Sequence, residues 1–448
     1  MTHYSNKTRF SLTGLASALL TAGLLATSGS LMADQLGGDT LTPMGAERAA
    51  SADGRIPAWT GGLTSGPGNW RDGYGNPFAD EQPLYVITAQ NYQDYQDRLA
   101  PGQVAMLQAY PDTYRIPVYP THRTAVHPDH VYEDIRGNAE TAQLVDNGNG
   151  VVNFSNVTPF PRPQTGVELV WNHSTRFRGT AAEREVTLAT PQTNGNFTPV
   201  TMNEEFMFIA DPDTNNLFFF LQSVTAPARL SGTVLLVQET MNQVQEGRRA
   251  WIYNAGQRRV RRAPQVAYDG PGTAADGQRT SDQLDLFNGS PDRYDWQLVG
   301  KQEMYIPYNA YKLLNTDISV RDVVQAGHIN PDHTRYELHR VWVVEGTVRD
   351  GQRHIYEKRV MYFDEDTYQL VHIDQYDGRG NLWRVSEGHT VQFWDVMVPW
   401  YAAEMVYDLV NRRYIVSGLV NDTRGYNWDY QANENNFTPA ALRRAGGR

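Results

Sequence analysis

The sequence predicts a mainly β fold in which one antiparallel sheet is flanked by helices. Turn sequences support it, because they are too short for the crossover that parallel strands need; they lie at 211–216, 254–256, 350–351 and 377–380. Side-chain alternation around Trp342 indicates a strand with two unlike faces. A hydrophobic share of 40% over 448 residues is enough for a large core.

The N-terminus has the pattern of an export signal. Lys7 and Arg9 precede an apolar run over 10–25, and Ala33 is a small residue before the acidic Asp34. A basic start, a short apolar stretch and a small residue predict a signal peptide over 1–33 that is cleaved after Ala33. A membrane anchor is the alternative, but the run is short for a bilayer span. Export without any cysteine fits a bacterial periplasm.

The rest of the chain, 34–448, is predicted to be a single elaborated domain. Gly and Pro punctuate 34–80, which is expected to be loop. Helices are expected over 88–99 and 104–110, within 88–110, on the concave side of a curved sheet. The sheet is expected over about 150–420, with one more short helix at 401–410.

The strands of that sheet follow from β-rich runs between turn sequences. They are predicted at 204–210, 217–224, 233–238, 251–253, 258–262, 336–348, 353–363, 368–376, 382–389 and 414–420. The acidic run 364–366 between two of them is predicted to be a solvated turn.

Composition excludes several classes of function. The formal net charge of −11 argues against nucleic acid as a partner. The absence of cysteine excludes disulfides, thiolate metal sites and cysteine nucleophiles. The sequence contains no nucleophile elbow, phosphate-binding loop, dinucleotide fingerprint or zinc-protease helix. No catalytic residue and no cofactor is therefore predicted.

Histidines and arginines form two candidate polar sites. His122, His127 and His130 are a weak candidate for a zinc or copper site, the alternative being exposed loop histidines. Four arginines with one valine among them are predicted to contact an anionic headgroup or a partner; they are Arg258, Arg259, Arg261 and Arg262. Pairing of these arginines with acids at an edge strand is the alternative.

Aromatic residues in the predicted strands form a candidate apolar site. We expect a hydrophobic cavity between sheet and helices, lined by Phe218, Phe220, Trp251, Tyr253 and Trp342. Packing of the same residues in an ordinary core is the alternative. A strand such as 218–220, with three consecutive Phe, must be covered on both faces.

Several long motifs resemble the family of domain of unknown function 1329. They are LTPMGAE at 41–47, IPAWTGG at 56–62, PVYPTHRT at 117–124, GQRRVRRAP at 256–264 and YELHRVWVV at 336–344. The family resembles the LolA/LolB-type outer-membrane lipoprotein-sorting carriers. That resemblance implies a curved, half-open antiparallel β-barrel whose concave face is covered by helices and which holds acyl chains. It also implies work alongside an outer-membrane barrel protein and an inner-membrane efflux-type transporter.

Three classes of function follow from the residues and the resemblance together. The leading one is a periplasmic, non-enzymatic carrier of a lipid or other hydrophobic molecule. The alternatives are a hydrolase or isomerase acting on such a molecule, and an assembly partner of an outer-membrane barrel protein that binds no ligand.

Overall fold

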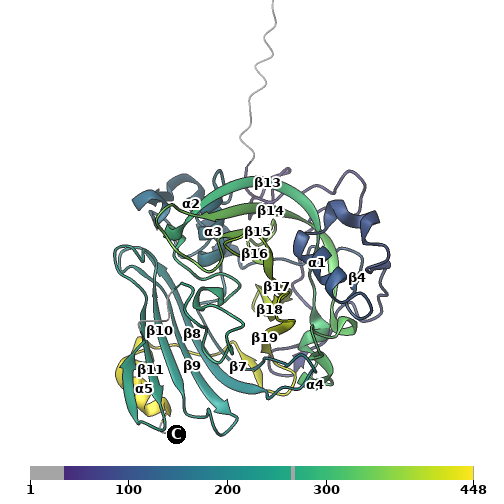
Figure 1. The fold of residues 1–448 in the computed structure, drawn as a ribbon. Coiled ribbons are helices and arrows are strands. Elements are labelled where there is room, and N and C mark those ends of the chain that lie inside the picture. The colour runs from purple at the N-terminus through teal and green to yellow at the C-terminus, as the bar shows by residue number, and fades with distance from the viewer. Residues whose placement is uncertain (1–34, 264–267, 447–448) are drawn as a thin grey trace, which may run out of the picture. The chain divides into compact units, whose positions relative to one another are not determined.

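One large open sheet organises the chain (Figure 1), whose computed structural model describes residues 35–263 and 268–446. Within these residues the sheet has 16 strands, and its main path runs β12-β11-β10-β9-β8-β7-β19-β18-β17-β16-β15-β14-β4-β3. β13 also pairs with β14, and β20 pairs with β7. Among the described pairings all are antiparallel except that of β4 with β14. The predicted class, a mainly β protein with one curved, open antiparallel sheet, is confirmed.

The strands occupy most of the chain after residue 180. The sheet contains β3 (Tyr85–Ile87), β4 (Ile116–Val118), β7 (Ala181–Ala189), β8 (Val200–Asp211), β9 (Asn216–Ala226), β10 (Val234–Thr240), β11 (Arg249–Asn254), β12 (Arg259–Arg262), β13 (Tyr294–Pro307), β14 (Tyr336–Val348), β15 (Lys358–Asp364), β16 (Leu370–Tyr376), β17 (Leu382–Phe393), β18 (Val398–Asp408), β19 (Arg413–Leu419) and β20 (Gly425–Asn427). Two small hairpins lie outside it: β1 (Gly68–Asn69) with β2 (Gly73–Tyr74), and β5 (Gln143–Val145) with β6 (Gly150–Val152).

Helices are short and lie around the sheet. The α-helices are α1 (Pro101–Ala109), α2 (Asp129–Thr141), α3 (Gly166–Thr175), α4 (Val320–Val323) and α5 (Pro439–Gly446). The 3₁₀ turns are η1 (Tyr92–Arg98), η2 (Asp146–Gly148), η3 (Ser281–Gln283), η4 (Pro291–Arg293), η5 (Tyr311–Leu314), η6 (Pro331–His333) and η7 (Glu434–Asn436). No helix of the described ranges is both long and apolar enough to cross a bilayer.

Most of the expected helices and strands are present, but one expected helix is a strand. The predicted helices of 88–110 correspond to η1 and α1. The helix expected at 401–410 is wrong, because these residues belong to β18. Every residue of β18 is buried, so its apolar run lacks the polar alternation of a half-exposed strand and resembles a buried helix. The expected signal peptide over 1–33, with its cleavage after Ala33, lies outside the described residues.

The two faces of the sheet carry different helices. On β15, Phe363 contacts the ring of His173 from α3, with ring centroids 6.1 Å apart. Its neighbour Tyr362 points to the opposite face, where its ring contacts His372 of β16. α1 lies on that second face, since the backbone N–H of Gly102 donates to Asp374 of β16 at 3.0 Å. We call the α3 side the inner face and the α1 side the outer face.

The inner face is the concave one. In Figure 1 β8 to β11 curve round to face β14 to β18, whereas α1 lies on the far side of β15 to β18. The helix that packs on the concave face is therefore α3, and α1 of the predicted 88–110 pair packs on the outer face. Register shifts in β13, β15 and β17 mark bulges that add local twist and bend the sheet.

Candidate functional site

A segment without long regular structure fills the inner face. It follows β12 and precedes β13, and we call residues 281–288 the plug segment. Its side chains Leu286 and Phe287 are each 1% exposed and belong to the main hydrophobic core. The plug segment therefore forms part of the apolar core on the inner face.

Asp282 anchors the start of the plug segment to β15. Its carboxylate accepts a hydrogen bond from Arg359 Nη2 at 2.5 Å and lies 3.1 Å from His354 Nε2. Both Asp282 and Arg359 are buried. Burial raises the pKa of Asp282, but the charges of Arg359 and His354 outweigh it and hold that pKa well below its usual range.

Asp285 anchors the middle of the plug segment to the residues that follow α3. Arg176 donates two hydrogen bonds to the Asp285 carboxylate, at 2.6 and 2.7 Å, and Arg178 donates one at 2.7 Å. Despite burial, the two guanidinium groups hold the pKa of Asp285 far below its usual range. The Arg178 guanidinium also lies 4.6 Å from the centre of the Phe208 ring on β8.

The backbone of the plug segment is strained next to this anchor. Asp285 and Leu286 have φ values of 57° and 60°. A left-handed conformation costs a branched residue such as Leu about 1–3 kcal/mol. The Leu286 N–H donates to Glu404 of β18 at 3.0 Å, and burial and the nearby Asp285 raise the pKa of Glu404 to about 7. Polar anchors thus hold a strained segment over an apolar surface.

A small pocket remains between the plug segment and strands β9 and β10. Its volume is about 40 Å³, whereas pockets for small molecules usually measure roughly 300–1,000 Å³. The lining is apolar on one side and polar on the other; it includes Phe220, Leu235, Val237, Leu284, Glu239, Arg248 and Arg279. An acyl chain does not fit while the plug segment is in place.

The predicted apolar residues fall into separate places. Phe218 and Phe220 belong to the main core, and of the five only Phe220 lines the described pocket. Trp251 and Tyr253 pack on the outer face, in a cluster with Phe437 near α5. Trp342 pairs with Phe363 across β14 and β15, and Lys301 Nζ lies 5.0 Å from its ring centre. Three of the five therefore lie on the inner face, and of these Phe218 and Phe220 are neighbours on β9 while Trp342 lies apart on β14.

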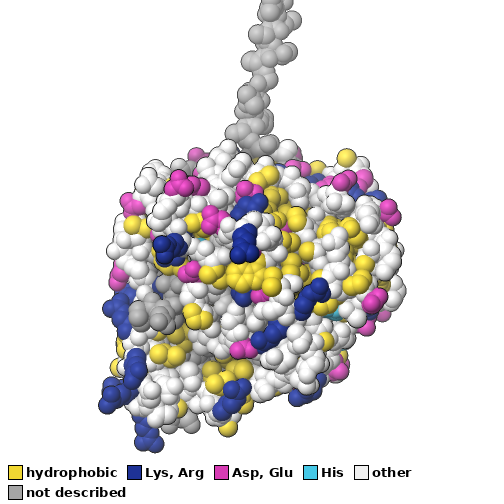
Figure 2. Space-filling model, viewed as in Figure 1, with side chains coloured by type: hydrophobic (Ala, Val, Ile, Leu, Met, Phe, Trp, Pro, Cys, Tyr) yellow, Lys and Arg dark blue, Asp and Glu magenta, His cyan; other side chains and the backbone are white. Residues whose placement is uncertain are grey.

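The predicted arginines form an exposed edge of the sheet. β12 ends the strand order, and Arg258, Arg259, Arg261 and Arg262 are all exposed. Within the described ranges none of the four is in an ion pair. α5, which packs on β10 to β12, adds the exposed Arg443 and Arg444. Figure 2 shows Lys and Arg side chains at the lower left, where Figure 1 places β11 and α5.

The three predicted histidines have different surroundings. His122 Nε2 lies 2.7 Å from a Glu81 carboxylate oxygen, and His130 is exposed. His127 is buried, which together with the charge of Arg176 lowers its pKa to about 3. In the part of the chain that the structure describes, the group with metal-binding spacing is instead His339, Asp364 and Asp366.

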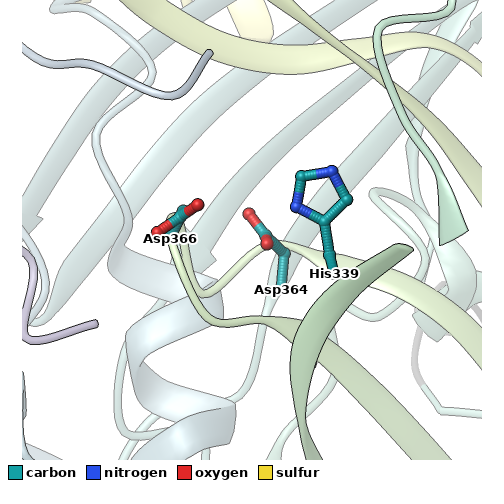
Figure 3. Close-up of side chains that lie close together, drawn as sticks. All are labelled: His339, Asp364 and Asp366. Atoms are coloured by element: carbon teal, nitrogen blue, oxygen red, sulfur yellow. The ribbon is translucent and has the colours of Figure 1, made fainter. Parts of the chain in front are cut away.

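The acidic run 364–366 is buried, so the predicted solvated turn is wrong. Asp364, Glu365 and Asp366 are 1%, 3% and 5% exposed. Arg123 binds Asp366 through two hydrogen bonds, and Lys301 donates one to Glu365. Neither partner is near in sequence, so no local pattern could have revealed this burial. Figure 3 shows Asp364 between His339 and Asp366.

The fold and site define a class: an open, curved antiparallel-sheet protein whose concave face is aromatic and is covered by a segment of its own chain. Within that class the chain belongs to the DUF1329 family of proteins of unknown function, whose model matches residues 86–443. This confirms the resemblance found in the sequence motifs.

Three known proteins are similar to this chain. The uncharacterized protein PA3922 of Pseudomonas aeruginosa is 55% identical, over 97% of this chain and 98% of its own. A DUF1329 family protein from Desulfovibrio piger has a solved structure with a TM-score of 0.45, 14% identity and coverage of 62% of this chain and 97% of its own. A LolA superfamily protein from Nitrosomonas europaea has a TM-score of 0.38, 15% identity and coverage of 62% and 98%.

Proposed function

We propose that this protein is a periplasmic carrier that binds a lipid or another hydrophobic molecule on the inner face of its sheet. The observation that carries the proposal is the way the inner face is covered. Leu286 and Phe287 are buried on an aromatic surface, yet the segment that bears them is irregular and strained. A core that served stability alone has no need of such a cover.

The plug segment acts as an internal substitute for the ligand. While it is closed, its apolar side chains pack in the same core as Phe218 and Phe220 of β9, and its Leu284 lines the small pocket beside Phe220. When it opens, an acyl chain takes the place of Leu286 and Phe287 and recovers the same apolar contacts. The energy of ligand binding is thereby reduced by the cost of opening, which lets a carrier release its cargo to the next acceptor.

The arginine edge on β12 is the proposed contact for an anionic headgroup or partner. Guanidinium groups form paired hydrogen bonds with phosphate and carboxylate, and these four carry no protein ion pair within the described ranges. The outer-membrane barrel protein and the inner-membrane transporter implied by the family resemblance are the proposed donors and acceptors of cargo.

Two neighbouring phenylalanines on β9 test the ligand site. Phe220 lies on the inner face and lines the pocket, whereas Phe219 lies on the outer face near Phe437. Both are buried, at 2% and 6% exposure, so truncation of either to Ala costs about 3–5 kcal/mol of unfolding free energy. The carrier proposal predicts that Phe220→Ala weakens binding of an apolar fluorescent probe and Phe219→Ala does not.

The experiment is a probe titration on exported protein, with oleate as the displacing molecule and urea unfolding of each variant at the same temperature. Native mass spectrometry of protein purified from its own periplasm identifies any bound molecule. Equal loss of probe binding in the two variants, in step with stability, would indicate an ordinary core. A supplied molecule that is released chemically altered would favour the enzyme alternative.

A further inference from the structure

A buried group of three polar side chains lies on the outer face, away from the plug segment. His339 is on β14, Asp364 ends β15, and Asp366 follows in the turn to β16. One potential ligand atom from each lies within 4.8 Å of the others. Figure 3 shows that a ring nitrogen of His339 faces the Asp364 carboxylate.

The hydrogen bonds of Glu337 determine which nitrogen of His339 is free. This carboxylate accepts hydrogen bonds from Arg335 Nε at 2.6 Å and from the His122 backbone N–H at 2.8 Å. Its Oε2 lies 3.2 Å from His339 Nε2, so Nε2 carries the proton. The lone pair of the neutral ring is then on Nδ1. A carboxylate that orients a histidine through its far nitrogen is the usual support of a metal ligand.

The carboxylate oxygens of Asp364 and Asp366 have lone pairs that no hydrogen bond uses. Asp364 Oδ2 accepts a hydrogen bond from Thr367 at 2.7 Å, but Asp364 Oδ1 is buried without any partner. A buried, unpaired carboxylate oxygen is costly unless it meets a cation. Asp366 is bound by Arg123, yet each carboxylate oxygen has two lone pairs, and one guanidinium does not use them all.

A small cavity lies near this group, although the three residues themselves do not line it. An enclosed cavity of about 10 Å³ is lined by polar side chains that include Thr367, Gln369 and Thr390. Tyr308 lines it as well, and its ring lies 4.0 Å from that of His339. A cavity of this size is near the lower limit for one water molecule.

We propose that His339 Nδ1, Asp364 and Asp366 bind one divalent transition-metal cation of the Zn²⁺ or Mn²⁺ kind. One imidazole and two carboxylates are a donor set that suits these borderline cations. The cation supplies the missing partner of Asp364 Oδ1 and joins β14 to the β15–β16 turn. Arg123, which holds Asp366 from the 117–124 region, ties that region to the same ion. This role is structural and independent of cargo binding.

Zn²⁺ titration of chelator-treated full-length exported protein tests the proposal. Calorimetry and native mass spectrometry should show one Zn²⁺ per chain, and the melting temperature should rise with Zn²⁺. Asp364→Asn and His339→Gln should each weaken Zn²⁺ binding at least roughly tenfold and abolish the rise in melting temperature. The control Asp350→Asn makes the same change at an exposed aspartate and should behave as the wild type.

Near-UV circular dichroism establishes that each variant is folded, and two ligand variants are used so that a folding failure in one does not decide the test. Retention of wild-type Zn²⁺ affinity by a folded Asp364→Asn or His339→Gln variant would overturn the proposal. So would a wild-type chain that takes up neither Zn²⁺ nor Mn²⁺, in which case Asp364 is a buried acid that keeps its proton.

Discussion

Removal of the Asp285 anchor should open the inner face and strengthen ligand binding. Asp285→Asn keeps the side-chain shape but leaves Arg176 and Arg178 buried with no anionic partner in the plug segment. Loss of one member of a buried ion pair costs about 3–5 kcal/mol. At the lower limit, a destabilisation of the closed form by about 3 kcal/mol raises the population of the open form by about 100-fold, as long as the closed form still predominates.

The apparent dissociation constant of an apolar probe should fall by the same factor, because the competent fraction sets the apparent affinity. Fluorescence titration measures it, with Asp295→Asn as the matched control. Asp295 pairs with Arg349 at 2.9 Å, but its side chain is 77% exposed, so its loss should change stability by less than about 1 kcal/mol and leave affinity unchanged. Unchanged or weaker probe binding by a folded Asp285→Asn protein would refute the idea that the plug segment competes with ligand.

Two further predictions concern charge. Burial lowers the pKa of His372, but Asp374 and Glu387 outweigh burial and raise it to about 9. The charged His372 ring therefore stabilises the folded state fully below pH 6.5, and this stabilisation is lost as pH rises through about 9. The unfolding free energy of the wild type relative to His372→Gln should therefore fall by about 3 kcal/mol over that window, and urea titrations that show a constant difference would contradict it. Arg259→Gln with Arg261→Gln should weaken binding to anionic vesicles at low salt, with convergence at high salt, whereas neutral vesicles should show no difference; sedimentation measures both.

The local content of the sequence predicts many of the strands but misses β7 and β13, and it predicts the site poorly. Short turns such as 377–380 force antiparallel neighbours, which is why β14 to β17 could be read from the residues. β18 could not, since burial on both faces removes its alternation. Which face a strand residue covers depends on distant elements: Phe219 contacts Phe437, which precedes α5, and Phe220 lines a pocket together with Leu284 of the plug segment.

The buried polar contacts could not be predicted from the sequence for the same reason. Asp285 and its partners Arg176 and Arg178 are more than 100 positions apart, with separations of 109 and 107. A run such as 364–366 looks exposed until Arg123, which is 243 positions before Asp366, is placed beside it. Charge complementarity across such separations is a property of the folded chain, and no spacing in the sequence encodes it.

Hydrogen exchange of the plug segment with and without ligand tests the carrier account most directly. The account predicts that oleate binding to the exported protein speeds exchange of backbone amides in 281–288, while β9 and β10 stay protected. Faster exchange there would show that ligand replaces Leu286 and Phe287 on the inner face. Binding of oleate with unchanged or slower exchange in 281–288 would contradict the account, because the inner face would then still be covered.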